Sequence, residues 1–293
     1  MILRTLLLIL LVLPLSVAAK IKVVASTTDL AYFARQIGGD LADVEAIAGP
    51  KADLHFVEAR PSYMVKVARA DLAFRVGLEL DMWFDKIVDG SRNGRLTLVD
   101  CSKYIEPLEV PGFKADARYG DLHRFGNPHY WTGPQNLEKI ARAILEGYTQ
   151  VDPANAEQYT ANRDKFIAGI EAQLPEIQEL AAPLSGMPIV FYHDTWPYFN
   201  AYFGTTAAEF IEPYPGVQPS PSHIKHLAEF IKGHGIKIIA IEPYFDARVP
   251  NHLARETGAK VVVVYPSIGG RQKDESYIDW LKGNISTLLE VSR

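Results

Sequence analysis

Short apolar runs that alternate with helical patterns are the feature that most constrains the fold of this chain. Strands are predicted over 21–25, 44–48, 72–76 and 96–99, with helices over 30–37, 63–70 and 134–148. The alternation restarts after residue 183, with strands over 189–192, 236–241 and 261–264 and helices over 221–232, 250–257 and 276–291. This order predicts parallel sheets with helices on both faces.

A long helical segment separates the two alternating regions. Apolar side chains recur at helical spacing from Ala154 to about Leu180. We therefore expect two Rossmann-like α/β lobes, over 20–150 and 184–293, joined by one long backbone helix over 151–183. Ligands of open parallel sheets lie beyond the carboxyl ends of the strands, so the cleft between the lobes is the predicted binding site.

The first 19 residues have the pattern of a secretory signal peptide. Arg4 precedes an apolar run over 6–15, small residues follow over 16–19, and the polar Lys20 comes next. The apolar run is shorter than the ~20 residues that span a bilayer, and no cysteine at its end offers a site for a lipid anchor. We therefore expect residues 1–19 to be a signal peptide and the mature chain to be soluble in the periplasm.

Charge and cysteine content limit the chemistry of this chain. The formal net charge is -5, which argues against nucleic acid as a partner and weakly favours a cationic ligand. Cys101 is the only cysteine, so neither an internal disulfide nor a cluster of thiolates can form. Any metal site must therefore be built from the eight histidines and from carboxylates.

Three histidines lie on loops that lead towards helices. His55 and His129 lie shortly before predicted helices, and His193 directly follows the strand that ends at Tyr192. They come from both lobes, so the cleft can bring them together, and imidazole is a good ligand for zinc. A single histidine after a strand is more often a surface or hydrogen-bonding residue, so position alone leaves a structural role open for each.

The remaining histidines have weaker patterns. His223 and His226 are three residues apart on a predicted helix, a spacing that can chelate a metal but that fits a solvated helix edge better. His123 lies in the loop before His129 and is a candidate for an auxiliary metal contact.

Five motifs occur in a fixed order along the chain. They are VASTTD at 24–29, ADLHFVEARPS at 52–62, NPHYWTGP at 127–134, YHDTWPYF at 192–199, and IAIEP at 239–243 with ARETGA at 254–259. In sequence and spacing they resemble those of the zinc- and manganese-binding solute-binding proteins of bacterial ABC importers. The resemblance covers essentially the whole mature chain, and it is the order of the motifs that makes it specific.

The resemblance implies a metal site with donors at His55, His129 and His193. In manganese-preferring relatives the third donor is a glutamate, whereas this chain has His193 there. Manganese prefers oxygen donors, so three imidazoles favour zinc.

The family's usual fourth donor, an aspartate in a loop after the last strand, is missing. The corresponding stretch, 264–269, reads VYPSIG and places Tyr265 where the aspartate belongs. Three interpretations stay open: Tyr265 binds as a phenolate, Glu242 reaches the metal, or water or chloride completes the site. A phenol has a pKa of about 10 and is a poor donor unless the metal lowers that pKa. Glu242 is alternatively a carboxylate that orients a ligand histidine.

The resemblance implies a periplasmic zinc receptor, not an enzyme, which delivers the ion to the membrane permease of an ABC transporter. We expect a monomer, with a metallochaperone as a further candidate partner and no nucleic acid. A manganese or iron receptor of the same family is the first alternative. A zinc-dependent hydrolase that uses the open fourth position is another, although Glu242 is its only serious candidate for a general base.

Overall fold

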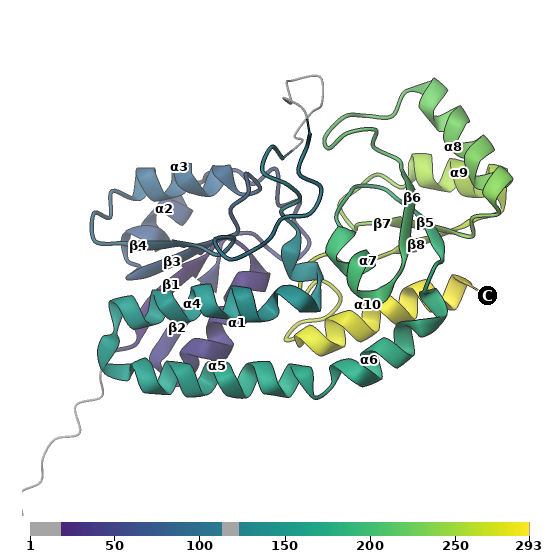
Figure 1. The fold of residues 1–293 in the computed structure, drawn as a ribbon. Helices are drawn as coiled ribbons and strands as arrows, with labels where there is room; N and C mark the ends of the chain where they lie inside the picture. Colours follow the sequence, from purple (N-terminus) through teal and green to yellow (C-terminus); the bar gives the residue numbers. More distant parts are fainter. Residues whose placement is uncertain (1–18, 113–122, 293) are drawn as a thin grey trace, which may run out of the picture.

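The computed structural model describes residues 19–112 and 123–292, and its strands form two four-stranded sheets (Figure 1). Neighbouring strands are parallel in both sheets, as predicted. The predicted signal peptide, 1–19, lies outside the described residues except for Ala19. Within the described part of the chain, no helix is both long and apolar enough to cross a membrane.

The N-terminal sheet has the strand order β2-β1-β3-β4. Its strands are β1 (Ile21–Ala25), β2 (Ala42–Ala46), β3 (Leu72–Arg75) and β4 (Thr97–Asp100), and its helices are α1 (Thr28–Gly38), α2 (Pro61–Ala68), α3 (Met82–Ser91) and α4 (Leu137–Val151). Helices α1 and α4 pack together on one face, and α2 and α3 pack together on the other (Figure 1). This confirms the predicted sandwich, in which helices bury the apolar strands from both sides.

The C-terminal sheet has the strand order β6-β5-β7-β8. Its strands are β5 (Pro188–Phe191), β6 (Thr206–Phe210), β7 (Ile238–Ile241) and β8 (Lys260–Val263), and its helices are α7 (Pro197–Phe203), α8 (Pro221–His234), α9 (Arg248–Thr257) and α10 (Tyr277–Ser292). Helices α8 and α9 pack against each other, and α10 packs on β7 and β8. The sequence pattern does not predict β6, which reads TAAEF and becomes a strand by pairing with β5 at the sheet edge.

The single linking helix expected over 151–183 is two helices, α5 (Ala156–Glu171) and α6 (Leu174–Ala181). Pro175 explains the break, because a proline ring clashes with the carbonyl one turn earlier and offers no N–H to continue the helix. Pro175 instead lies in the first turn of α6, where an N–H would lack a helical partner anyway. The two helices still follow one another along the same side of both lobes (Figure 1).

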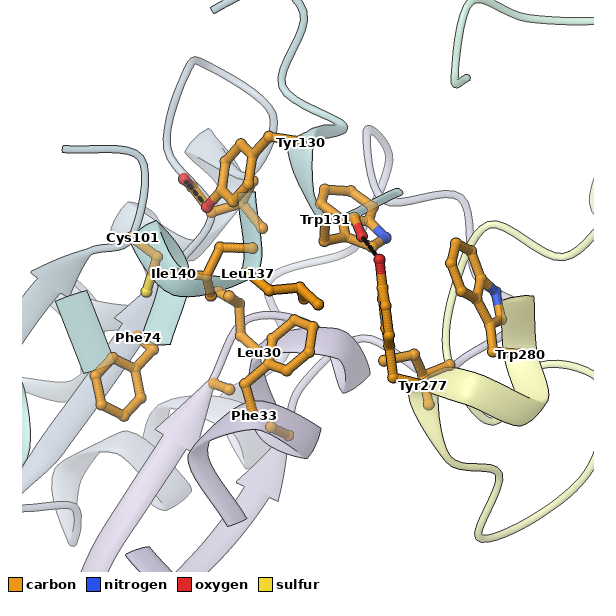
Figure 2. Close-up of a cluster of buried hydrophobic side chains, with 14 of the residues drawn as sticks. Leu30, Phe33, Phe74, Cys101, Tyr130, Trp131, Leu137, Ile140, Tyr277 and Trp280 are labelled. Atoms are coloured by element: carbon orange, nitrogen blue, oxygen red, sulfur yellow. Dashed lines mark hydrogen bonds between the residues drawn. The ribbon is translucent and has the colours of Figure 1, made fainter. Parts of the chain in front are cut away.

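One hydrophobic cluster runs through both lobes. Figure 2 shows Leu30 and Phe33 of α1, Trp131, and Tyr277 and Trp280 of α10 within it. The hydroxyl of Tyr277 donates a hydrogen bond of 3.1 Å to the carbonyl oxygen of Trp131. A second cluster lies on the opposite face of the C-terminal sheet, under α8 and α9. The lobes therefore share a packed core, which limits their motion relative to each other.

Asp29, in the first turn of α1, adds a buried hydrogen bond between the lobes. Its side chain is fully buried, and its Oδ1 accepts the backbone N–H of Ile268, in the loop after β8, at 2.8 Å. Burial raises the pKa of Asp29 to about 7, although hydrogen bonds to the carboxylate act against this rise. The folded state therefore holds the Asp29 proton more tightly than the unfolded chain does, and ionisation of Asp29 destabilises the fold.

We expect the stability that Asp29 contributes to be greatest below about pH 4 and to fall as the pH rises to about 7. The pKa of Asp29 is about 7 in the folded chain against an ordinary value of 3.8. This difference corresponds to at most about 4 kcal/mol in the free energy of unfolding. Asp29→Asn, whose amide oxygen can still accept the Ile268 N–H, should lose less stability than wild type between about pH 5 and about pH 8 in urea unfolding. The exposed Asp43→Asn is the matched control. Parallel pH profiles for wild type and Asp29→Asn would contradict this assignment.

Candidate metal centre

The three histidines singled out in the sequence lie together between the lobes. One ring nitrogen from each of His55, His129 and His193 lies within 4.8 Å of the other two. The ring centroids are 4.9, 5.3 and 5.5 Å apart. His129 and His193 are buried, and only 8% of the His55 side chain is exposed. The structure therefore brings these residues into one compact cluster.

The elements that carry these histidines belong to different lobes. His55 lies in the loop between β2 and α2, and His129 immediately precedes the short helical turn Tyr130–Thr132. His193 follows β5, at the carboxyl end of a central strand of the C-terminal sheet. The cluster therefore forms only because the two lobes pack on each other, and it lies where open parallel sheets bind ligands.

Each of the three rings is held through Nδ1 by an oxygen atom. His55 Nδ1 lies 3.0 Å from Asp53 Oδ1, and His129 Nδ1 lies 3.0 Å from Asn127 Oδ1. In both cases the same oxygen also accepts the backbone N–H of the histidine at 3.0 Å. An oxygen acceptor at Nδ1 places the proton there and leaves the Nε2 lone pair free, which is the arrangement of metal-ligating histidines.

Glu212 holds the third ring in the same way. Its Oε2 lies 3.0 Å from His193 Nδ1, and both side chains are almost completely buried. The Nε2 atom of His193 is buried and has no hydrogen-bond partner among the described residues. A buried polar atom without a partner is rare and needs an explanation. An ion held between the three rings would supply the missing partner.

The electrostatics of the cluster favour neutral imidazoles over charged ones. Burial lowers the pKa of His129 well below its ordinary value, and the neighbouring His55 and His193 rings add to this effect. Burial also lowers the pKa of His193, although Glu212 acts in the opposite direction. For Asp53, burial alone would raise the pKa, but the hydrogen bond and charge of His55 outweigh it and the pKa is lowered. The neutral imidazoles of His129 and His193 are therefore in the protonation state that binds a cation.

Glu242 lies outside the three-histidine group, at the end of β7. Among the described histidines, cysteines and acidic residues, that group contains only the three histidines. Glu242 is fully buried, and its Oε1 accepts the indole N–H of Trp196 at 2.9 Å. Its Oε2 has no hydrogen-bond partner within the described residues. Burial raises the pKa of Glu242 to about 8, so this group tends to keep its proton rather than act as an anionic ligand.

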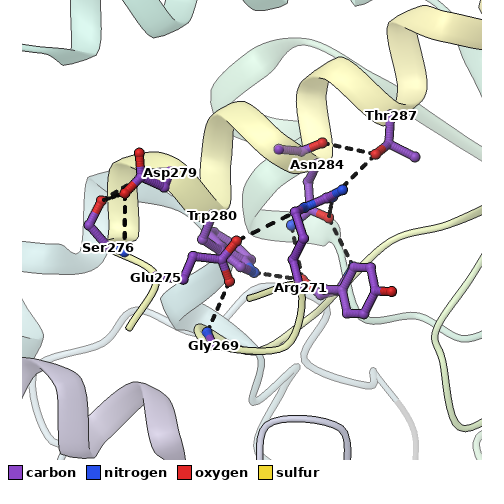
Figure 3. Close-up of polar contacts among 10 residues, drawn as sticks. Gly269, Arg271, Glu275, Ser276, Asp279, Trp280, Asn284 and Thr287 are labelled. Atoms are coloured by element: carbon purple, nitrogen blue, oxygen red, sulfur yellow. Dashed lines mark hydrogen bonds and ion pairs between the residues drawn. The ribbon is translucent and has the colours of Figure 1, made fainter. Parts of the chain in front are cut away.

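Tyr265 lies in the loop after β8. Figure 3 shows Arg271 of the same loop beside Asn284 and Thr287 of α10, to which it is hydrogen-bonded. The carbonyl oxygen of Tyr265 accepts hydrogen bonds from Trp280 Nε1 at 2.6 Å and from Asn284 Nδ2 at 2.9 Å. The guanidinium of Arg271 lies 5.1 Å from the centroid of the Tyr265 ring. The recorded contacts of Tyr265 therefore connect it to its own lobe, and none of them joins it to the three histidines.

A fourth histidine, His123, lies beside the cluster. Its Nε2 is 3.2 Å from His55 Nε2, and the two rings stack with centroids 5.2 Å apart. Burial, helped by the neighbouring His55 and His193 rings, lowers the pKa of His123 to about 2, so its ring is neutral. By contrast, His223 Nε2 donates to the carbonyl oxygen of Phe210, and His226 is largely exposed, as expected of residues on a solvated helix edge.

A cavity of about 210 Å³ adjoins the cluster. His123, His129 and His193 line it together with the acidic residues Glu109 and Asp194. Burial and the nearby Glu109 raise the pKa of Asp194 to about 9. The cavity is large enough for several water molecules, so it offers an ion room to exchange its hydration shell for protein ligands.

Sequence reasoning missed the residues that hold the rings. Asp53 and Asn127 each lie two positions before a histidine, a local spacing typical of side chains that accept backbone N–H groups in turns, and it could have identified them. Glu212 follows β6, a strand with no clear pattern, and lies 19 positions from His193. No signal near His193 in the sequence points to it.

Two parallel α/β sheets with a buried histidine cluster between them define a two-lobed binding protein for a small ligand. The chain matches the family model described as zinc-uptake complex component A, periplasmic (ZnuA), over residues 23–291. The chain therefore belongs to the ZnuA family of periplasmic solute-binding components.

Individual relatives match almost the whole chain at low identity. The iron-binding protein YfeA of Yersinia pestis is 26% identical over 286 residues, which cover 94% of this chain and 88% of YfeA. The high-affinity zinc uptake system protein ZnuA of Bacillus subtilis is 24% identical over 279 residues, which cover 92% and 87% of the two chains. A crystal structure of ZnuA has a TM-score of 0.80 at 23% identity, over 94% of this chain and 100% of that one. This structural similarity shows that the two chains share the same fold.

We expect Glu212→Ala to weaken zinc binding by ~10- to 100-fold, because His193 loses the acceptor that fixes its ring and tautomer. Glu212→Gln retains an amide oxygen and should keep most of the affinity. Competition titration against a chromophoric chelator measures the zinc affinity of both variants. Glu209→Ala is the control, because Glu209 precedes Glu212 by three residues and faces the exposed His226. Equal affinities for wild type and Glu212→Ala would show that this hydrogen bond does not support the site.

Proposed function

We propose that this chain is an extracytoplasmic zinc-binding receptor that delivers the ion to the membrane permease of an ABC importer. The observation that carries the proposal is the convergence of three imidazoles whose Nδ1 atoms are all held by oxygen. Such rings are oriented for metal before the metal arrives, so little ordering is needed on binding. Membership of the ZnuA family supports the same function.

The nature of the donors favours zinc as the ion. We propose His55, His129 and His193 as ligands, each through Nε2, and a set of nitrogen donors suits zinc better than manganese. The relative from Bacillus subtilis carries a zinc-uptake name, whereas that from Yersinia pestis is called iron-binding. An iron or manganese receptor is therefore the alternative to be tested, and it predicts a different metal in the same site.

A tetrahedral zinc ion also needs a fourth ligand besides the three histidines. Tyr265 and Glu242 are the candidates that the sequence offers. Both side chains already have other partners, an arginine for Tyr265 and a tryptophan for Glu242. We assign neither as a ligand.

We propose that the receptor acts as a periplasmic monomer, exported by means of residues 1–19, with a metallochaperone as a further candidate partner. The core shared by the lobes, with Trp131 hydrogen-bonded to Tyr277, supports a capture mechanism in which loops rearrange more than lobes swing. Trp131 lies two positions after His129, so movement of that histidine is limited by the same packing.

Protein purified without chelators from cells grown with mixed metals should contain about one zinc per chain, because one four-donor site holds one ion. His129→Ala should lose tight binding, since the remaining donors cannot complete the site. Elemental analysis and competition titration measure the two quantities. The exposed His234→Ala is a matched control that removes an imidazole far from the cluster in sequence.

Two results would count against this proposal. If the purified protein contained manganese or iron in place of zinc, the receptor function would stand but the proposed ion would be wrong. Zinc binding by His129→Ala with the affinity of wild type would show that the cluster is not the site.

A further inference from the structure

We propose that His123 supplies the fourth donor, so that the metal is held by four histidines; this inference rests on the proposed metal-receptor function. His123 Nε2 lies 3.2 Å from His55 Nε2. Two nitrogen ligands of a tetrahedral zinc ion, each at about 2.0–2.1 Å, are separated by roughly 3.3–3.4 Å. This one pair of nitrogens therefore already has nearly the separation that a shared zinc ion requires. His123 lies outside the group of donor atoms that are all within 4.8 Å of one another, so its ring must move closer to His129 and His193 when it binds the ion.

A hydrogen bond between the two rings accounts for the close approach of these nitrogens. His55 donates its Nδ1 proton to Asp53, so its Nε2 bears a lone pair. The contact at 3.2 Å then requires the proton of His123 to lie on Nε2. When zinc takes the His55 lone pair, His123 needs only to change tautomer, from Nε2–H to Nδ1–H, to offer a second one. No proton is gained or lost by the protein in this step.

The surroundings of His123 permit that change of tautomer. Unlike the other three rings, His123 has no hydrogen-bond partner recorded for Nδ1 within residues 19–112 and 123–292. Among these described residues its Nδ1 is therefore free to carry the proton, and His123 is only 8% exposed. A nearly buried imidazole that stacks on His55 and lies edge-on to His129, with centroids 6.3 Å apart, has the properties of a donor.

An ion pair next to His123 fixes the segment that carries it. The backbone N–H of Arg124 donates to Glu79 Oε2 at 2.9 Å, and its guanidinium donates to Glu79 Oε1, with Nε at 2.9 Å. Glu79 lies in the turn before α3, where its φ of 67° is left-handed. The Glu79 pair therefore ties His123 to the N-terminal lobe. Glu79 is a positioning residue, which acts on the metal only through His123.

A cysteine substitution gives a direct spectroscopic test. We expect His123→Cys loaded with one equivalent of cobalt(II) to show a thiolate-to-cobalt charge-transfer band in the near ultraviolet. Wild type should lack the band, because its only cysteine, Cys101, is buried in the core. His234→Cys, with an exposed thiol, is the matched control and should lack it as well. A His123→Cys protein that binds one cobalt without the band overturns the inference.

Two further measurements keep the test decisive if the cysteine variant does not fold. X-ray absorption of wild-type protein with one zinc should show four imidazole donors; three imidazoles and one oxygen would overturn the inference. His123→Gln should raise the zinc Kd by about tenfold or more, and Glu79→Gln by a smaller factor, without a change in the one-zinc stoichiometry. If the zinc Kd rose in Tyr265→Phe but stayed unchanged in His123→Gln, the fourth donor would be the phenol of Tyr265 instead. Wild type that binds no metal would refute the proposed function itself, a result distinct from all of these.

Discussion

The histidine cluster depends on hydrogen bonds between the histidine Nδ1 atoms and fixed oxygen acceptors. These bonds set both the tilt of each ring and its tautomer, so that the Nε2 lone pairs face one point. Two of the acceptors, Asp53 and Asn127, also receive the backbone N–H of their histidine, so they orient the loop and the ring together. Without these two acceptors, the tautomers of His55 and His129 would not be set in advance, and an ion would have to impose them.

Charge balance follows from the same contacts. Asp53 and Glu212 place carboxylates directly behind His55 and His193, whose rings are mostly or fully buried. A buried carboxylate is costly unless a charge or strong hydrogen bonds compensate it. Two carboxylates behind neutral imidazoles match the charge of a divalent cation, which would relieve this cost. The position of these carboxylates therefore supports the proposed ion on electrostatic grounds as well as geometric ones.

The packing between the lobes decides how much of this arrangement can move. Trp131, which follows His129 closely, donates its indole N–H to the carbonyl of Pro266 at 2.9 Å and receives a hydrogen bond from Tyr277. The second histidine loop is thus fixed to the C-terminal lobe. His123, outside both sheets, depends on the Glu79–Arg124 ion pair instead.

The sequence alone determined the parts of this protein that depend on neighbours along the chain. The alternation of apolar runs with helical patterns predicted parallel strands between helices, and the loop motifs identified three of the histidines. The sequence interpretation gave one linking helix, and only the structure showed that Pro175 divides it into α5 and α6. Only the tertiary structure decided which acceptor holds His193 and which ring faces His55. Glu212 reaches His193 through the pairing of β6 with β5, and His123 meets His55 from 68 positions away. Such contacts arise from packing and register between distant segments, which local patterns do not encode.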